Sequence, residues 1–237
     1  MDAAGYTTLS RQSGLMREMQ VVANNIANIS TTGFRREGVI FAEDLVRMDE
    51  GPSLSMAHAT ARHVDLREGS LTQTGGTFDF AIQGDGFFLI ETPGGQRLSR
   101  AGSFMPNANG ELVTPDGYRL LDAGAAPVFV PSNAGPVSLA SDGTLSAGGK
   151  PLARVGLWQP NTATDLRHQS GTMYDAPGGV QPTEGGTILQ GFVEESNVNP
   201  VSEIARMITV QRAYELGQAF LDREDNRVRG VIQTLGR

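Results

Sequence analysis

The chain has 237 residues, a net charge of −7 and no cysteine. This length can supply one large domain or two modest ones with a real core. The lack of cysteine excludes disulfides, thiol nucleophiles and thiolate metal sites, and the acidic balance argues against a nucleic-acid binder, since neutralising phosphates requires clustered Lys and Arg. No stretch approaches the roughly 18 apolar residues of a membrane span, and no cleavable signal peptide is visible at the start.

Glycine and proline divide the chain into three zones. Residues 38–198 hold 24 of the 30 glycines and 11 of the 12 prolines. Residues 1–37 and 199–237 each carry a net charge of +1, which leaves −9 for the middle. This distribution predicts helical ends and a turn-rich β middle.

The N-terminal zone has a heptad pattern typical of a helix that packs on another helix. Its apolar residues are spaced 4, 3, 4 and 3 apart: Leu15, Met19, Val22, Ile26 and Ile29. We call this set the N-terminal seam. The pattern predicts a helix that stops at Ser30-Thr31-Thr32-Gly33, where Gly33 can take a left-handed conformation.

The C-terminal zone predicts a helix of about 36 residues. Asn199 is a candidate N-cap with Pro200 at the first helical position. Its seam, the C-terminal seam, alternates spacings of 3 and 4: Met207, Val210, Tyr214, Gly217, Leu221, Glu224, Val228, Val231 and Leu235. Gly217 permits close backbone approach, and Glu224 fixes register or faces a partner's arginine. Both could equally be tolerated defects in a loosely packed seam.

The middle zone alternates short apolar runs with turn signals such as Gly84-Asp85-Gly86 and Pro115-Asp116-Gly117. This pattern favours an antiparallel sandwich or barrel-like all-β domain. The expected fold class is therefore α+β, with long terminal helices paired in a coiled-coil-like domain and an inserted β domain. The predicted boundaries are 1–37 plus 192–237 for the helices, 38–70 for an extended connection and 71–191 for the β domain.

No motif in the sequence favours catalysis or a cofactor. His58 and His63 lack the spacing of a helical metal pair, and no nucleophile elbow is present. Asn107-Ala108-Asn109-Gly110-Glu111 superficially resembles a calcium loop but lacks the distant bidentate Glu. We expect no catalytic, cofactor-binding or metal-binding residues and no small-molecule substrate. Paired carboxylates for glycan hydrolysis stay open, because their separation is three-dimensional.

The two terminal helices favour self-assembly. Two helices alone bury too little apolar surface to offset the entropy of ordering them, so their apolar faces need further partners. Head-to-tail contacts that do not close would build a helical filament. The asparagines Asn24, Asn25 and Asn28 are either a solvated face or a hydrogen-bonding strip between subunits. The predicted assembly interface is both seams with these asparagines.

Several motifs, in order, also resemble a known family. They are Ala23–Arg35, Gly69–Gly75, Ala81–Phe88, Arg100–Phe104, Gly110–Val113, Asp116–Tyr118, Gln190–Gly191, Glu195–Pro200 and Gln211–Glu215. They are spread over nearly the whole chain, and they are similar to motifs of the rod, hook and hook-associated proteins of the bacterial flagellar axis. The short length and small middle domain resemble a proximal rod subunit, with a distal rod or hook-type subunit as the alternative.

The resemblance implies a non-catalytic structural protein that transmits torque and forms the axial export channel. It implies export through the flagellar type III system without a cleaved signal, and a place in the periplasmic rod of the basal body. The implied partners are further copies of the chain and other proximal and distal rod proteins, with no membrane insertion. A peptidoglycan-binding or peptidoglycan-cleaving β domain is the alternative from another functional class.

Overall fold

The computed structural model describes residues 3–46 and 54–235. The chain forms two compact units. The helical unit comprises Met1–Ala27, Glu37–His63 and Asn199–Arg237, and the β unit comprises Asn28–Arg36 and Val64–Val198. The elements that build the helical unit are α1 (Ala3–Ala27), β1 (Glu37–Val46), β2 (Leu54–Val64, whose last residue groups with the β unit) and α2 (Pro200–Leu235).

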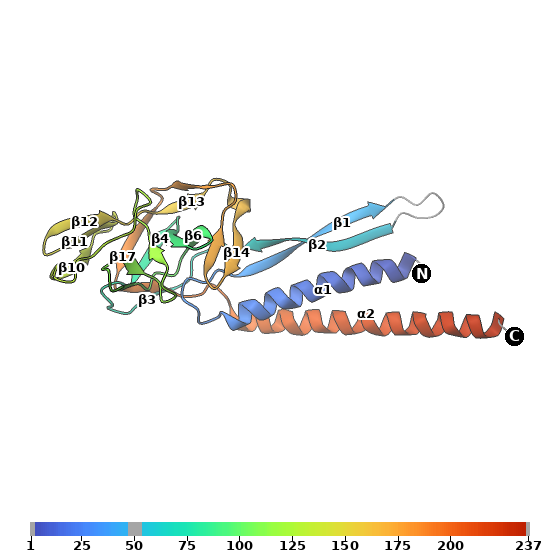
Figure 1. Cartoon of the computed structure of the whole chain (residues 1–237). Helices are drawn as coiled ribbons and strands as arrows, with labels where there is room; N and C mark the ends of the chain where they lie inside the picture. The colour runs from blue at the N-terminus through green and yellow to red at the C-terminus, as the bar shows by residue number, and fades with distance from the viewer. Residues whose placement is uncertain (1–2, 47–53, 236–237) are drawn as a thin grey trace. The chain divides into compact units, whose positions relative to one another are not determined.

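The helices α1 and α2 lie side by side and run in opposite directions (Figure 1). The start of α2 confirms the predicted cap, because Asn199 Oδ1 accepts a hydrogen bond from the backbone N–H of Ser202 across 3.1 Å. Pro200 occupies the first helical position, where its missing N–H costs nothing. The helix spans 36 residues, as the sequence predicts. The first helix spans 25 residues, so α2 is the longer partner.

The region 38–70, expected as an extended connection, contains most of β1 and all of β2, which pair in a two-stranded sheet. Residues 47–53 lie outside the described chain. The two described arms of this region are strands that hydrogen-bond to each other.

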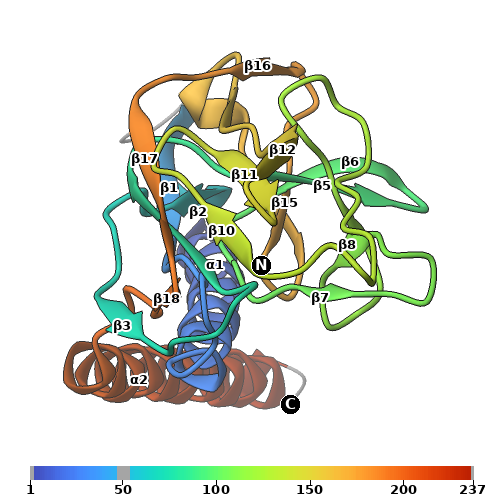
Figure 2. The same cartoon turned by 90° about the vertical axis from the view of Figure 1, so that its left-hand side faces the viewer.

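The β unit consists of short strands joined by tight turns. They form a seven-stranded sheet in the order β14-β15-β6-β5-β9-β8-β7, a three-stranded sheet β10-β11-β12, and the pairs β13-β16, β17-β4 and β18-β3. Figure 2 shows β10, β11 and β12 next to one another. The strands are β3 (Leu71–Gln73), β4 (Phe80–Gly84), β5 (Phe88–Thr92), β6 (Gly95–Ser99), β7 (Met105–Pro106), β8 (Leu112–Val113), β9 (Arg119–Leu120), β10 (Val137–Leu139), β11 (Thr144–Ala147), β12 (Lys150–Arg154), β13 (Trp158–Pro160), β14 (Arg167–Ser170), β15 (Met173–Asp175), β16 (Val180–Pro182), β17 (Gly186–Gln190) and β18 (Phe192–Glu194), with a 3-10 turn at Ala163–Asp165.

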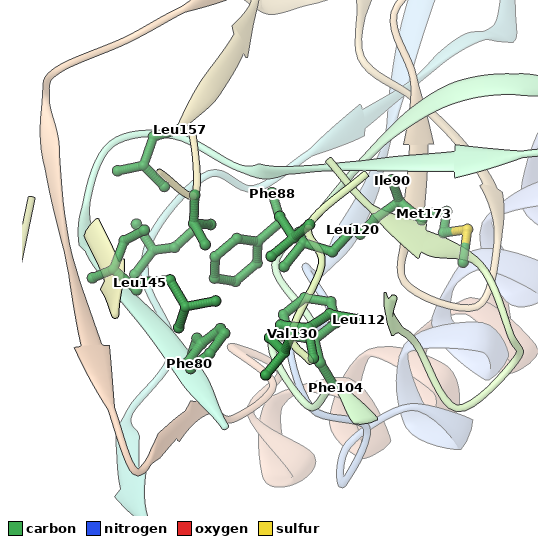
Figure 3. Packing of buried hydrophobic residues seen from close by; sticks show 14 residues of the cluster. Phe80, Phe88, Ile90, Phe104, Leu112, Leu120, Val130, Leu145, Leu157 and Met173 are labelled. Atoms are coloured by element: carbon green, nitrogen blue, oxygen red, sulfur yellow. The ribbon is translucent and has the colours of Figure 1, made fainter. Parts of the chain in front are cut away.

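The main core cluster of the β unit is mostly aliphatic, with three phenylalanines among its buried residues. Phe80, Phe88 and Phe104 pack together, with ring centroids 5.8 Å apart for Phe80–Phe104 and 5.4 Å apart, edge to face, for Phe88–Phe104. Leu120 and Leu145 are fully buried beside them (Figure 3). The strands that pair within the described part of this unit run antiparallel. The α+β class is therefore confirmed.

Residues 28–36, which follow α1, belong to the β unit. Gly33 has φ +72°, as expected, and a Cβ there would lie 2.2 Å from the backbone nitrogen of Ala101. Only glycine fits this close approach. Beside it, the fully buried Arg35 pairs with Glu194 across 2.8 Å, and Arg100 pairs with the same carboxylate across 3.1 Å. Burial lowers the pKa of Arg35, and the charge of Glu194 opposes that shift.

Candidate assembly interface

Burial along α2 follows the predicted seam. Val210 is buried, and the residues at spacings of 3 and 4 on either side of it are half-buried: Met207, Tyr214, Gly217, Leu221 and Glu224. On α1, Leu15 and Val22 are buried and Met19 and Ile26 are half-buried. Ile29 lies beyond the end of α1, in the β unit, and is half-buried there. The structure thus brings the middle of both seams into one helix pair.

The last residues of the C-terminal seam have no such cover. Val228 is 44% exposed, Val231 47% and Leu235 82%. Every residue from Asp225 to Leu235 is exposed. These last three turns of α2, which we call the α2 extension, therefore continue the apolar pattern on a surface that α1 does not reach.

The three predicted asparagines differ in their surroundings. Asn25 is fully buried, donates through Nδ2 to Glu37 O at 2.9 Å and to Glu203 Oε2 at 3.1 Å, and accepts from Glu37 N at 2.9 Å. Its amide serves contacts within the chain. Asn24 and Asn28 are half-buried, and Asn28 Oδ1 accepts a hydrogen bond from the Thr31 hydroxyl at 3.0 Å.

Two buried polar residues of the helix pair were missed in the sequence. Glu203 is 0% exposed and stands seven residues before Val210, on the same face of α2. Gln12 is 7% exposed and donates to the backbone carbonyl of Tyr214 at 2.8 Å. The spacing of seven residues between Glu203 and Val210 could have indicated that Glu203 lies on the buried face. A search for apolar residues does not consider polar side chains. Gln12 lies three residues before Leu15, which was the corresponding signal on α1.

Charged groups flank the pair. Arg206 on α2 pairs with Glu18 on α1, with 2.8 Å between Nη2 and Oε1. Glu224, which was considered as a contact for a partner's arginine, pairs with Arg227 of its own helix at 2.9 Å. The Glu18–Arg206 pair joins the two helices at the edge of their contact.

A further apolar strip lies on α2, outside the predicted seam. Val201 is 77% exposed, Ile204 51% and Ile208 44%. Their spacing of 3 and 4 puts them on one face of the helix, and that face is turned away from the buried Glu203 and Val210. Exposed apolar side chains in such a row are typical of surfaces that contact another macromolecule. We call it the outer strip.

Neither helix, over its described length, is long and apolar enough to cross a membrane. Within residues 3–46 and 54–235 no group of three or more His, Cys, Asp or Glu is placed to hold a metal ion. These two findings concern the described chain alone.

The β unit has a hollow of about 360 Å³, and its lining includes two acidic residues, Asp142 and Glu184. The carboxylate of Asp142 accepts hydrogen bonds from Thr144 N and Thr144 Oγ1, each at 2.9 Å. These bonds, the backbone one first, lower the pKa of Asp142. A general acid for glycan cleavage needs a raised pKa, so Asp142 is tuned away from that role.

Three family models match the chain in order. The model described as "Flagella basal body rod protein" matches residues 6–35, the flagellar hook protein FlgE/F/G D1 domain matches residues 81–147, and the flagellar basal body rod FlgEFG protein C-terminal model matches residues 189–233. The first and third cover the segments that contain most of α1 and α2. The second covers the middle of the β unit, from β4 to β11.

The chain is also similar over its length to curated rod proteins. It is 40% identical over 234 residues to the flagellar basal-body rod protein FlgF of Mesorhizobium japonicum, with 98% of this chain and 97% of the relative covered. It is 36% identical to FlgF of Caulobacter vibrioides, with 100% and 99% covered, and 29% identical to the rod protein FlgG of Bacillus subtilis, with 96% and 97% covered. The chain therefore belongs to the flagellar basal-body rod protein family and is most similar to members named FlgF.

Proposed function

We propose that this chain is a non-catalytic structural subunit of the proximal part of the flagellar rod and assembles through α1 and α2. The proposal is carried by one observation. The helix pair leaves two rows of large apolar side chains uncovered, the outer strip and the α2 extension. Exposed apolar rows do not stabilise a monomer, whereas neighbouring subunits in a filament would bury them.

The same arrangement suits a mechanical role. Helices packed along a common axis resist twisting through many side-chain contacts at once, while the acidic β unit suits the outside. In this proposal the helices form an inner tube that transmits torque and lines the export channel. The assembly residues are both seams, with the half-buried Asn24 and Asn28, and Asn25 supports them from within the chain.

The proposed location is the periplasmic rod of the basal body. The chain would reach it through the flagellar type III export channel without a cleaved signal. Its partners are other copies and the neighbouring proximal and distal rod proteins. The whole-length similarity to proteins named FlgF favours the proximal rod over the distal rod or hook.

The outer strip supplies the test. The change Ile208→Asp introduces a charge on an exposed position and so leaves the fold of the monomer intact, with a change in Tm of less than about 2 °C. In a strain that lacks the native gene, this variant should be exported but should not restore swimming or complete rods. The control Gln218→Asp places the same charge at an exposed polar position of α2 and should swim normally.

Normal swimming with Ile208→Asp would refute a role of the outer strip in assembly. The rival function, binding or cleavage of peptidoglycan, has its own test. Purified protein incubated with peptidoglycan sacculi should neither co-sediment with them nor release soluble fragments. Release of fragments that Glu184→Gln abolishes would favour the rival.

A further inference from the structure

The chain passes between the helical unit and the β unit four times, at the peptide links 27–28, 36–37, 63–64 and 198–199. A force carried along the chain from one unit to the other passes through these links. The last three links leave the β unit at Arg36, Val64 and Val198, which we call the exits. The contacts around the exits therefore decide whether the β unit stays closed when a force acts on the helical unit.

Two of the exits lead into one short strand pair. The chain runs from Val64 to β3 and from β18 to Val198, and these two strands of three residues each pair antiparallel. Leu71, the first residue of β3, lies opposite Glu194, the last residue of β18. Both exits therefore leave the pair at the same end, which we call the fork. A torque on the helical unit moves the exits in different directions, and so opens the pair from the fork, one hydrogen bond after another.

The side-chain amide of Asn197 ties the three exits together. Its Oδ1 accepts a hydrogen bond from Arg36 N at 2.6 Å, and its Nδ2 donates to Asp65 O at 3.0 Å and to Arg67 O at 2.7 Å. Asp65 N in turn donates to Arg36 O at 2.8 Å. Arg36, Asp65 and Asn197 each lie at an exit or directly beside one. One amide thus uses its acceptor and both N–H donors on the segments that lead out of the β unit.

Further bonds close the space between the fork and Asn197. Glu194, 1% exposed, accepts a hydrogen bond from Gly69 N through Oε1 at 3.0 Å, and Glu195 N donates to Ser70 O at 2.8 Å. A Cβ at Gly69 would lie 1.9 Å from the backbone oxygen of Glu195, so only glycine lets the two segments come this close. The pairing of β3 with β18 therefore continues beyond the strands themselves and ends at Asn197.

We propose that Asn197 is a mechanical clasp that keeps the fork closed while the helical unit carries torque. The inference rests on the proposed function, because a subunit that transmits torque is the one that needs such a clasp. The clasp differs from an ordinary stabilising contact in what its loss affects. Without Asn197 the pair β3–β18 opens more often, whereas the global stability of the β unit changes little, because its core is built by other strands.

Hydrogen exchange of the purified full chain tests the clasp without load. Asn197→Ala should raise the exchange rates of the β3 and β18 amides about tenfold, because the lost bonds favour local opening, while the amides of β5 exchange as before. Asn107→Ala is the matched control, since Asn107 is also a half-buried asparagine of the β unit with three hydrogen bonds. It should leave the β3 and β18 amides unchanged. Equal acceleration of these amides in both variants would overturn the proposal.

A covalent bond between β3 and β18 should replace the clasp. Thr72 and Val193 lie directly opposite each other in the pair, and opposed residues of antiparallel strands have Cα atoms about 4.5–5.5 Å apart, within the range of a disulfide. The chain has no cysteine of its own, so Thr72→Cys with Val193→Cys in the Asn197→Ala background gives one defined bond. Oxidation should restore slow exchange of both strands, and reduction should abolish it. Fast exchange in the oxidised protein contradicts opening at the fork, and a chain that stays unfolded despite the bond contradicts the clasp.

The flagellar motor supplies the load. In cells that lack the native gene, Asn197→Ala should support rod assembly and rotation in dilute medium and should lose rotation in viscous medium, whereas Asn107→Ala rotates in both. Loss of rotation in both media would make Asn197 a folding or assembly residue and refute the clasp. Rotation equal to that of the unsubstituted chain in viscous medium would refute the clasp and leave the proposed function standing. Absence of the unsubstituted chain from isolated basal bodies would instead refute the proposed function.

Discussion

The side-chain amide of Asn25 donates a hydrogen bond to the carboxylate of Glu203, 178 residues further along the chain, across 3.1 Å. The same amide binds the backbone of Glu37 on both sides, at 2.9 Å each. One fully buried side chain therefore joins the end of α1, the first residue of β1 and the first turn of α2. All three belong to the helical unit.

Removing this amide should loosen the helical unit alone. Asn25→Ala leaves the backbone groups of Glu37 and the carboxylate of Glu203 without their shared partner, at a cost of about 1–3 kcal/mol. We expect helical circular dichroism to melt at a lower temperature. The fluorescence of Trp158, the one tryptophan in the sequence, should melt as before, since it lies in the β unit.

Asn24→Ala is the matched control, because Asn24 is half-buried and its bond to Glu37 Oε2 is longer, at 3.4 Å. Its effect should stay below about 0.5 kcal/mol. Equal losses at the two positions would contradict the special place of Asn25.

The buried ion-pair cluster in the β unit should, in contrast, affect the stability of the β unit and not that of the helical unit. Glu194→Gln leaves the guanidinium groups of Arg35 and Arg100, 1% and 3% exposed, without their counter-charge. Breaking a buried ion pair in this way costs about 3–5 kcal/mol. Urea unfolding followed by Trp158 fluorescence should show the loss. Asp175→Asn removes the partner of Arg97 in a pair that is 18% and 26% exposed, and should cost about 1 kcal/mol or less.

The carboxylate of Asp142 should titrate below its ordinary pKa of 3.8 because Thr144 donates two hydrogen bonds to the ionised form. A folded-state pKa below that of the unfolded chain stabilises the fold at every pH above the unfolded value. The contribution then disappears as the pH falls through the lowered folded value. Carboxyl ¹³C NMR titration measures this pKa directly. Thr144→Val should move it upward and Thr144→Ser should not, and an unmoved pKa in Thr144→Val would contradict the assignment.

Charges in the middle of the seams should act on the monomer as well as on assembly. Leu221 on α2 and Ile26 on α1 are half-buried in the helical unit. Leu221→Asp or Ile26→Asp should abolish motility and rod completion, and should lower the helical melting temperature while Trp158 reports a folded β unit. Normal swimming with both variants would count against the seams as the assembly surface.

The sequence predicted those features that depend on local chemistry or on a regular period. Asn199 and Pro200 marked the start of α2 because a cap and a proline have fixed places at a helix start. Gly33 marked the end of the first helical zone, although α1 stops a few residues earlier, at Ala27. The alternation around Val210 predicted the α2 face that packs on α1. Each of these can be read from fewer than ten neighbouring residues.

Features that depend on distant partners were not predicted. Gln12 and Glu203 are polar, and nothing near them in the sequence shows that the backbone of Tyr214 or the amide of Asn25 satisfies them. The pairing of β1 with β2 was missed for the same reason, since a strand's partner is set by tertiary contact and not by its own propensity. Val228 is exposed because α1 is shorter than α2. The spacing of apolar residues on α2 carries no information about the length of α1, so this exposure could not be predicted.

The packing of α1 on α2 also sets the earliest time during synthesis at which the helical unit can fold. The first helix ends at Ala27 and its partner begins at Pro200, about 170 residues later. At a synthesis rate of roughly 5–20 residues per second, that stretch takes about 9–35 s to make. Until then α1 lacks the cover that α2 gives to it, so the helix pair stays incomplete during this time. A chain truncated anywhere in the middle zone therefore cannot form the helix pair.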